Sequence, residues 1–355
     1  MDGYNVAVVG GGSAGCVLAA RLSEDPSRQV LLVEAGPDYP TVADLPDDLT
    51  SGWSPTMSHD WGFHSAPDPG GTTIALPRAK VIGGCSSTNA TCVLRGPPAD
   101  YDRWGTIGNP GWSFAEALPF FRKLEHDQDV ADEWHGGHGP LPVRRYRRDG
   151  LTPWSRAALE VLIDAGHPWV EDLNHPNAVG VGAVPNNTID GVRMSTALTY
   201  LAQARHRPNL TILADTLVDR VVLRGGRASG IRVVGPQTEE EIDGDLVVVA
   251  AGTFCSPAIL LRSGIGPAAE LVELGIPVEA DLPGVGANLQ EHPSVGCAVP
   301  IQPMDGPRYQ VLVTWASRLC PAGWPFETCT WCQRSTASRC PGAPRALSGG
   351  WRPTS

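Results

Sequence analysis

The sequence predicts an α/β protein whose first domain is built on a parallel sheet. The run Asn5 to Val9 is short, apolar and rich in valine, as strands buried on both faces are. A glycine-rich turn, a helical pattern from Ser13 to Leu22 and a second apolar run from Gln29 to Val33 follow it. Strand, turn, helix and strand in this order form a β-α-β unit. Such a unit is typical of Rossmann-like dinucleotide-binding domains.

The turn in this unit has the spacing G-x-G-x-x-G, at Gly10, Gly12 and Gly15. Gly10 allows a tight turn, Gly12 lets a pyrophosphate approach the backbone, and Gly15 lets the helix pack closely on the strand. The first helical N–H groups, at Ser13 and Ala14, then face the phosphates. A glycine-rich turn of some other α/β protein is the alternative. The order of strands and helix around the glycines argues against it.

The second strand ends at Glu34, which Ala35 follows. A carboxylate in this place can accept hydrogen bonds from ribose hydroxyls, and its charge would repel a 2′-phosphate. The unit alone does not decide between FAD and NAD.

The composition excludes several classes of function. The chain has 355 residues, 42% of them hydrophobic, and a formal net charge of −11. This acidity argues against nucleic acid and against an anionic membrane surface as partners, since both require a basic face. No apolar run is long enough to span a bilayer, and no secretory signal precedes the first strand. We therefore expect a cytoplasmic location.

The middle of the chain predicts loops and two helices. The segment Pro37 to Gly71 is typical of a loop, and we interpret Trp61 and Phe63 within it as packing residues. One helix is predicted after the N-cap-like Ser113, and another over Leu151 to Ala165.

Two groups of side chains resemble sites but have simpler interpretations. His135 and His138 lie in the loop HGGHG without a third metal ligand of suitable spacing, so a glycine-rich loop is favoured over a metal centre. Several cysteines lie in apolar or glycine-rich segments, which favours reduced and buried thiols: Cys16, Cys85, Cys92 and Cys255.

The later part of the chain returns to strand patterns. Arg193 to Ala197 can open a helix, and Asn209 to Val234 alternates polar and apolar residues across Gly225-Gly226. Asp245 to Ala251 predicts a strongly buried strand, with a small-residue turn and a helix over Ala258 to Ser263 after it. If this strand lies parallel to the first one, its turn contacts the same ligand.

A second glycine-rich loop lies at Gly83-Gly84. Small residues in series let the backbone approach a flat ligand, and Asn89 offers a donor and an acceptor for ring edges. A plain tight turn is an equally good interpretation of these residues alone.

Together these motifs resemble the glucose–methanol–choline (GMC) family of FAD-dependent oxidoreductases over about residues 4–293. Ala79 to Asn89 resembles the first family signature, and Gly252 to Gly266 fits the second. Leu282 to Pro293 resembles a further family loop. The resemblance implies FAD as the cofactor and the oxidation of a primary or secondary alcohol by hydride transfer to the flavin N5. It implies the following cofactor-binding residues: Gly10, Gly12, Ser13, Ala14, Gly15, Glu34, Ala35, Val81, Gly83, Gly84, Asn89, Ala90, Val218 and Ala251.

Two departures from the family pattern stand out. The loop GGCSSTN is similar to that of choline oxidases, in which a histidine linked covalently to the flavin occupies the position of Thr88. Threonine cannot form that bond, so we predict non-covalent FAD. The family's catalytic histidine and its partner belong to a C-terminal part that has no counterpart after Pro303. No catalytic residue is therefore assigned.

These observations predict a domain organisation and two competing functions. Residues 1–300 form the GMC N-terminal region, with FAD-binding segments at about 1–105 and 195–300 and a segment of an incomplete α+β substrate domain at about 106–194. Residues 301–355 are expected to be irregular, from truncation or a shifted reading frame. The leading function is the FAD-binding part of an enzyme acting on a choline-like or other primary alcohol. The alternative is an inactive fragment that binds FAD at most. The alcohol and the electron acceptor stay open.

Overall fold

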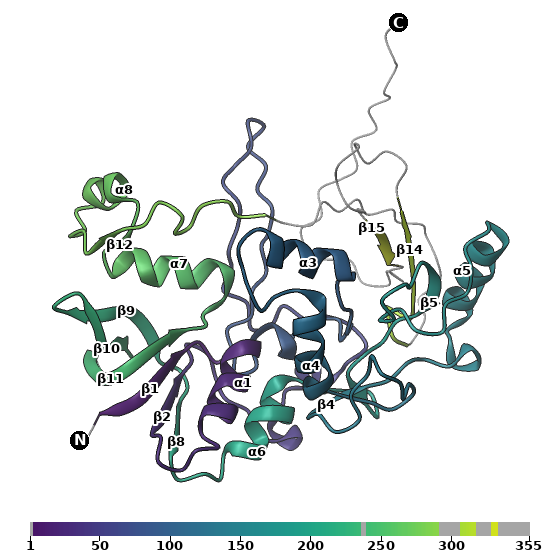
Figure 1. Cartoon of the computed structure of the whole chain (residues 1–355), viewed down its shortest axis with the longest axis horizontal. Coiled ribbons are helices and arrows are strands. Elements are labelled where there is room, and N and C mark those ends of the chain that lie inside the picture. Colours follow the sequence, from purple (N-terminus) through teal and green to yellow (C-terminus); the bar gives the residue numbers. More distant parts are fainter. Residues whose placement is uncertain (1–2, 236–238, 291–305, 317–327, 333–355) are drawn as a thin grey trace, which may run out of the picture.

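The computed structural model describes residues 3–235, 239–290, 306–316 and 328–332 (Figure 1). Its main element is a six-stranded sheet with the strand order β8-β2-β1-β11-β10-β9. The strands of this sheet are β1 (Tyr4–Val9), β2 (Val30–Val33), β8 (Leu210–Leu213), β9 (Leu217–Arg224), β10 (Arg227–Val234) and β11 (Glu239–Val249).

The sheet confirms the predicted α/β class. Strands β8, β2, β1 and β11 are parallel, and Val8 of β1 pairs with Leu32 on one side and Val248 on the other. Strands β9, β10 and β11 extend the sheet antiparallel, and β9 and β10 meet at the predicted Gly225-Gly226 turn. The fold is therefore mostly parallel at the end where the β-α-β unit lies.

Valine suits β1 because both faces of this strand are buried. Val6 and Val8 pack with Cys16 of α1 (Ser13–Leu22) in one cluster. Ala7 and Val9 point to the other face and pack with Ile259 of α7 (Gly252–Arg262) in a second cluster. Successive side chains of a strand point to opposite faces, so one short apolar run supplies both clusters.

Strand β11 differs from its prediction in burial, and α7 differs in its start. Leu246 of β11 is 52% exposed, and its neighbours to Val249 are at most partly buried, because both apolar clusters reach this strand only at their margins. Helix α7 begins at Gly252 rather than Ala258 and contains Pro257. Pro257 is the sixth of its eleven residues; it removes one backbone hydrogen bond, and the helix continues past it.

A second unit surrounds a small antiparallel sheet. Its strands are β5 (Gly180–Ala183), β14 (Val311–Ala316) and β15 (Thr328–Cys332). Helix α5 (Pro153–Asp164) packs on it, and α3 (Pro98–Thr106) and α4 (Phe114–Leu124) lie between this sheet and the large one in Figure 1. The predicted helices at Ser113 and Leu151 are confirmed as α4 and α5. Ser113 forms a capping box with Glu116.

The segments β14 and β15 correct the expectation of an irregular chain after residue 301. Val311 to Thr314 pair with β5, and Val313 is 1% exposed. Gln310, also 1% exposed, accepts a hydrogen bond from the Thr152 N–H at the start of α5, at 2.9 Å. Composition concealed these strands, because it averages over a longer stretch than a five- or six-residue strand occupies. The remaining parts of the expected tail, at 301–305, 317–327 and 333–355, lie outside the described residues.

Short elements complete the described chain. They are the helical turns η1 (Val42–Asp44), α2 (Asp47–Thr50), η2 (Gly84–Ser87), η3 (Arg148–Gly150), η4 (Ala197–Leu201), α6 (Ala202–Ala204) and α8 (Ala268–Glu273), and the strands β3 (Glu125–Asp127), β4 (Leu141–Val143), β6 (Thr188–Ile189), β7 (Val192–Arg193), β12 (Ile265–Gly266) and β13 (Ala280–Asp281). Element η4 is the helical turn predicted toward Leu201. Within the described ranges no helix is long and apolar enough to cross a membrane.

Candidate cofactor groove

A groove of about 690 Å³ lies at the carboxyl ends of β1, β2 and β11. In open parallel sheets this edge is where ligands bind. Nine of the predicted site residues line it: Gly10, Gly12, Ser13, Ala14, Glu34, Ala35, Gly84, Val218 and Ala251. The structure thus brings together residues from five separate stretches of sequence.

The three glycines of the first turn have different surroundings. A Cβ on Gly10 would lie 2.7 Å from the Ala250 oxygen, and one on Gly15 would lie 1.9 Å from the Gly10 oxygen. At Gly12 the nearest atom to such a Cβ is Gly84 Cα, at 4.0 Å. Gly10 and Gly15 are therefore fixed by close packing of the protein itself, whereas the side of Gly12 is open to the groove.

Helix α1 directs its N-terminus into the groove. Its N-cap is Gly12, which makes no side-chain cap, and Ser13 and Ala14 line the groove. The first N–H groups of a helix have no partner within the helix, and the helix dipole favours negative charge there. This end can hold a phosphate group.

Glu34 stands beside the same turn with its carboxylate buried. One oxygen accepts from the Gly11 N–H at 2.8 Å and the other from the Gly36 N–H at 3.0 Å. Burial raises the pKa of Glu34, and these two backbone donors act in the opposite direction. Each oxygen keeps a second lone pair, so the fixed carboxylate can still accept hydrogen bonds from ligand hydroxyls.

The second glycine loop lies against the first turn. The Gly83 N–H donates to the Gly11 oxygen at 2.7 Å, and Gly84 lines the groove. Val81 is 1% exposed and is buried beneath the loop. Asn89 is exposed, and its Oδ1 accepts from the Thr91 N–H at 2.9 Å.

Five predicted residues do not line the groove itself: Gly15, Val81, Gly83, Asn89 and Ala90. Gly15, Val81 and Gly83 support its floor from within the protein. Asn89 and Ala90 follow η2 in the chain, and their predicted role in cofactor binding stays a prediction.

An aromatic arm forms a wall that sequence reasoning missed. His59 to Lys80 folds back on itself, with bridges between Asp60 and Ala79 and between His64 and Ala75. Near its base, Trp61 stacks on Phe63, with ring centroids 5.8 Å apart.

These two rings take part in the groove and do not simply pack on the surface, which corrects our interpretation. Phe63 contacts Phe254 of α7, with centroids 5.6 Å apart, and the Arg78 guanidinium lies 4.7 Å from the Phe254 centroid. Trp61, Phe63, Arg78 and Phe254 all line the groove. The alternation of aromatic and other residues at Trp61 and Phe63 was the available signal.

The four cysteines predicted to be buried differ in exposure: Cys16 is buried, Cys92 and Cys255 are intermediate, and Cys85 is exposed. Cys16 is fully buried, and burial raises the pKa of its thiol to about 12, in agreement with the predicted inert thiol. Cys85 is exposed in η2 and lines the groove, so the prediction of a buried thiol is wrong there. Gly84 and Cys85 are neighbours in η2, and both are presented to the groove.

The His135 loop is a buried ionic cluster, which corrects its interpretation as a plain glycine-rich loop. His135 Nδ1 lies 3.0 Å from oxygens of Glu125 and Asp127, and Nε2 lies 3.0 Å from Asp172 Oδ2. Carboxylate oxygens only accept hydrogen bonds, so both ring nitrogens must donate and the ring is an imidazolium.

Two arginines complete this cluster. Arg145 donates to both oxygens of Asp127, at 2.8 and 2.9 Å, and to Asp172 at 2.6 Å. Arg95 donates to Glu125 at 2.5 Å. Three carboxylates then face three cations. Although Glu125, Asp127 and His135 lie close enough to hold a metal ion, the cations already balance their charge, and we interpret the group as ion pairs.

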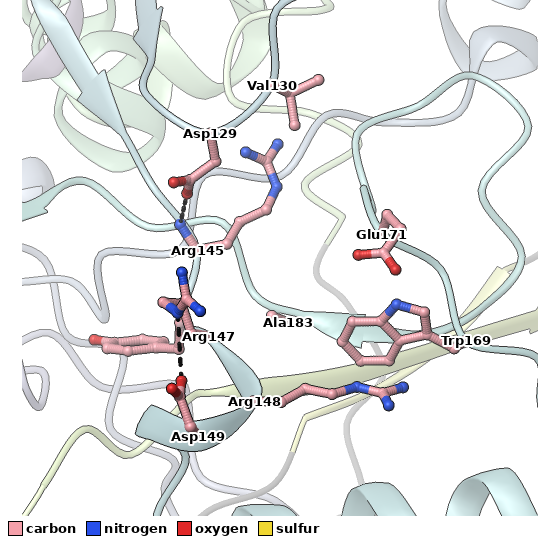
Figure 2. A pocket seen from close by; sticks show the side chains of 10 residues that line it. Asp129, Val130, Arg145, Arg147, Arg148, Asp149, Trp169, Glu171 and Ala183 are labelled. Atoms are coloured by element: carbon pink, nitrogen blue, oxygen red, sulfur yellow. Dashed lines mark hydrogen bonds and ion pairs between the residues drawn. The ribbon is translucent and has the colours of Figure 1, made fainter.

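A second cavity, of about 620 Å³, lies in the other unit beside β5 (Figure 2). Trp169 and Glu171 stand on one side of it and Asp129 and Arg145 on the other. The Arg148 guanidinium lies 4.1 Å from the Trp169 ring centroid. No residue that lines this cavity lines the first groove, so the two are separate.

The sheet, the glycine turn at a helix N-terminus and the buried acid define a Rossmann-like dinucleotide-binding protein. Comparison with known proteins makes this more specific: a family model described as GMC oxidoreductase matches residues 4–294. The chain belongs to this family, which confirms the resemblance inferred from its motifs.

Named relatives agree with this assignment. The chain is 42% identical over 291 residues to an oxygen-dependent choline dehydrogenase of Rhizobium etli, covering 80% of this chain and 52% of the relative. Among solved structures, pyridoxine 4-oxidase from Mesorbium loti matches with a TM-score of 0.74 at 36% identity, covering 79% of this chain and 55% of the other. An FAD-dependent oxidoreductase from Chaetomium thermophilum matches with a TM-score of 0.72 at 33% identity, covering 79% and 51%. The chain spans about half the length of these relatives.

Proposed function

We propose that the groove binds FAD and that the chain is the cofactor-binding part of an alcohol-oxidising enzyme. The observation that carries this proposal is the open side of Gly12 at the N-terminus of α1, next to the fixed carboxylate of Glu34. A dinucleotide needs a phosphate site and a ribose site side by side. The similar solved structures include an FAD-dependent oxidoreductase, which supports FAD as the dinucleotide.

Each part of the groove suits one part of FAD. The N–H groups at Ser13 and Ala14 would hold the pyrophosphate, and Glu34 the adenosine ribose. Val218, which also lines the groove, would flank the adenine. Gly84 would let the backbone approach the central part of the cofactor.

The protein and the cofactor have separate tasks in the proposed reaction. FAD, when bound, supplies the acceptor for a hydride from the alcohol carbon. The described residues bind and orient it, and the Trp61 and Phe63 rings shield one side of the groove from water. Among the residues that the structure describes, no histidine lines the groove, and we assign no proton acceptor within it.

The flavin is proposed to be held without a covalent bond. Thr88 occupies the place of the histidine that carries the bond in choline oxidases, and its hydroxyl has no comparable reactivity toward the flavin. Acid precipitation of the loaded protein should release all of its yellow colour into the supernatant. Flavin that stays in the washed pellet would contradict this part of the proposal.

The substrate is proposed to be a choline-like or other primary alcohol, from the names of the relatives. The test is an anaerobic titration of the FAD-loaded protein with choline, pyridoxine and a longer aliphatic alcohol. Loss of the visible flavin band with one of them indicates hydride transfer. A flavin band that no alcohol bleaches indicates the alternative, a chain that binds FAD without turnover.

A further inference from the structure

Arg193 of β7 is a buried cation whose described partners are main-chain carbonyl oxygens. Its exposed fraction is 1%. Nη1 donates to the oxygens of Leu49 and Ser87 at 3.1 and 2.5 Å. Nη2 donates to those of Ser51 and Ser54 at 2.7 and 2.6 Å. Burial lowers the pKa of Arg193 to about 10, so the side chain stays charged at neutral pH.

These acceptors belong to two segments that are distant in sequence. Leu49 lies in the short helix α2, and the last carbonyls of a helix have no partner within it. Ser87 is the last residue of η2. The planar guanidinium presents N–H groups in several directions at once and satisfies carbonyls of both segments. Arg193 therefore joins the segment 48–54 to the second glycine loop.

The same stretch of chain contacts the loop a second time. The Thr196 N–H donates to Ser86 Oγ at 3.1 Å, and Ser86 Oγ donates to the Gly83 oxygen at 2.6 Å. Arg193 and Thr196 thus bind the adjacent residues Ser87 and Ser86 of η2.

The loop they hold forms part of the groove. The Gly83 N–H donates to the Gly11 oxygen at 2.7 Å, and Gly84 and Cys85 line the groove. A Cβ on Gly84 would lie 2.6 Å from Gly12 Cα, so the two glycine turns touch. A shift of the loop therefore changes the groove directly at its proposed phosphate site.

We propose that Arg193 is a positioning residue for this groove: it holds the loop 83–87 against the turn 10–15 and so sets the space available to the cofactor. The identity of the cofactor as FAD rests on the proposed function. The role of Arg193 in positioning the loop is independent of it. Lysine is a poor substitute, since its single nitrogen cannot reach the carbonyls of α2 and of Ser87 together.

The test compares R193M and R193K with wild type. Two readouts are used: the rate at which iodoacetamide alkylates Cys85, followed by peptide mass spectrometry without cofactor, and the dissociation constant for FAD. Loss of several charge-assisted hydrogen bonds should raise the alkylation rate and weaken FAD binding, each about tenfold in R193M. R193K should fall between R193M and wild type. The visible circular dichroism of bound flavin should change in both variants.

The matched control is R207M. Arg207 also donates to the main chain at a helix C-terminus, to the Ala20 oxygen, and to Ser23 Oγ at 2.9 Å. That contact is at the opposite end of α1 from the groove. R207M should lower the melting temperature and leave both readouts unchanged.

Three outcomes are decisive. A folded R193M with both readouts within about twofold of wild type overturns the proposal, because that difference is too small for the loss of several such bonds. If R193M does not fold, R193K decides in the same way. If wild type binds no FAD, the proposed function fails, while the alkylation of Cys85 still tests the role of Arg193.

Discussion

At the scale of single residues, the identity of Gly12 matters for the ligand and little for the protein. Its backbone has a φ of −71°, which any residue can adopt, and the site of its Cβ has no neighbour closer than 4.0 Å. Gly10 and Gly15 are different, since their side-chain positions are filled by the chain itself. Gly10 and Gly15 are thus required by packing within the protein, whereas Gly12 leaves space for the ligand.

The first prediction concerns G12A. The added methyl group should occupy the space of the pyrophosphate and weaken FAD binding about tenfold or more. The free energy of unfolding should change by less than about 1 kcal/mol. Fluorescence titration with FAD and urea denaturation measure the two effects.

The control for this variant is G137A. Gly137 is exposed, and its Cβ position meets no atom within 4 Å. G137A should bind FAD as wild type does. If G12A also binds FAD with unchanged affinity, the phosphate does not lie at this turn.

At the scale of elements, the cluster around His135 joins three segments by buried charge. Glu125 and Asp127 belong to β3, His135 and Arg145 flank β4, and Asp172 precedes β5. Burial of an ion is offset only while its partners are present. The ion pairs of this cluster therefore fix the positions of these short strands relative to one another, in addition to their few backbone hydrogen bonds.

The second prediction follows from this dependence. H135Q keeps a polar side chain of similar length but removes the charge, and it cannot donate to carboxylates on both sides. The free energy of unfolding should fall by about 3–5 kcal/mol. H138Q is the control: His138 is exposed in the same loop, and its replacement should change stability by less than about 0.5 kcal/mol. Equal effects of the two variants on stability would contradict a stabilising role of the His135 ion pairs.

A third prediction concerns pH. Burial lowers the pKa of His135, but hydrogen bonds from its ring to Asp127, Asp172 and Glu125 outweigh burial and raise it to about 11. The folded pKa lies above the ordinary value of 6.5, so this stabilisation is complete below that value and is lost as the pH rises through about 11. The stability difference between wild type and H135Q should shrink over this range. A difference that stays constant to pH 11 would show that the ring charge contributes nothing.

The fourth prediction tests the place of β14 in the second unit. Val313 packs with Leu151, Leu159 and Val181. V313D would bury an unpaired carboxylate and should lower the free energy of unfolding by at least about 3 kcal/mol. V272D, on the exposed surface of α8, is the control and should be nearly neutral. A stable V313D protein would show that the chain after residue 305 is not part of the fold.

At the scale of the whole molecule, local patterns predicted most of the nucleotide-binding half. The apolar run of β1, the glycine turn and the helix α1 are close in sequence, so the local residue pattern is enough to predict their structure. The parallel pairing of β1 with β11 meets the condition under which the turn after β11 was expected to contact the same ligand. Nine of the predicted site residues accordingly line one groove.

The features that were missed depend on contacts between distant residues. The role of Trp61 and Phe63 depends on Phe254, nearly two hundred positions away. His135 meets Asp172 only because β3, β4 and β5 come together, and Arg193 reaches Ser87 across 106 positions. No spacing rule covers such distances, and side-chain chemistry alone leaves each of these residues several possible partners.

The proposed function depends above all on binding of FAD by the groove at the first glycine turn. The most direct test is isothermal titration of FAD into the wild-type protein, with G12A titrated in parallel. Wild type should bind one FAD per chain saturably, and G12A should lose at least nine-tenths of the affinity. Absence of binding to a folded wild-type protein, or equal binding by both proteins, would contradict it.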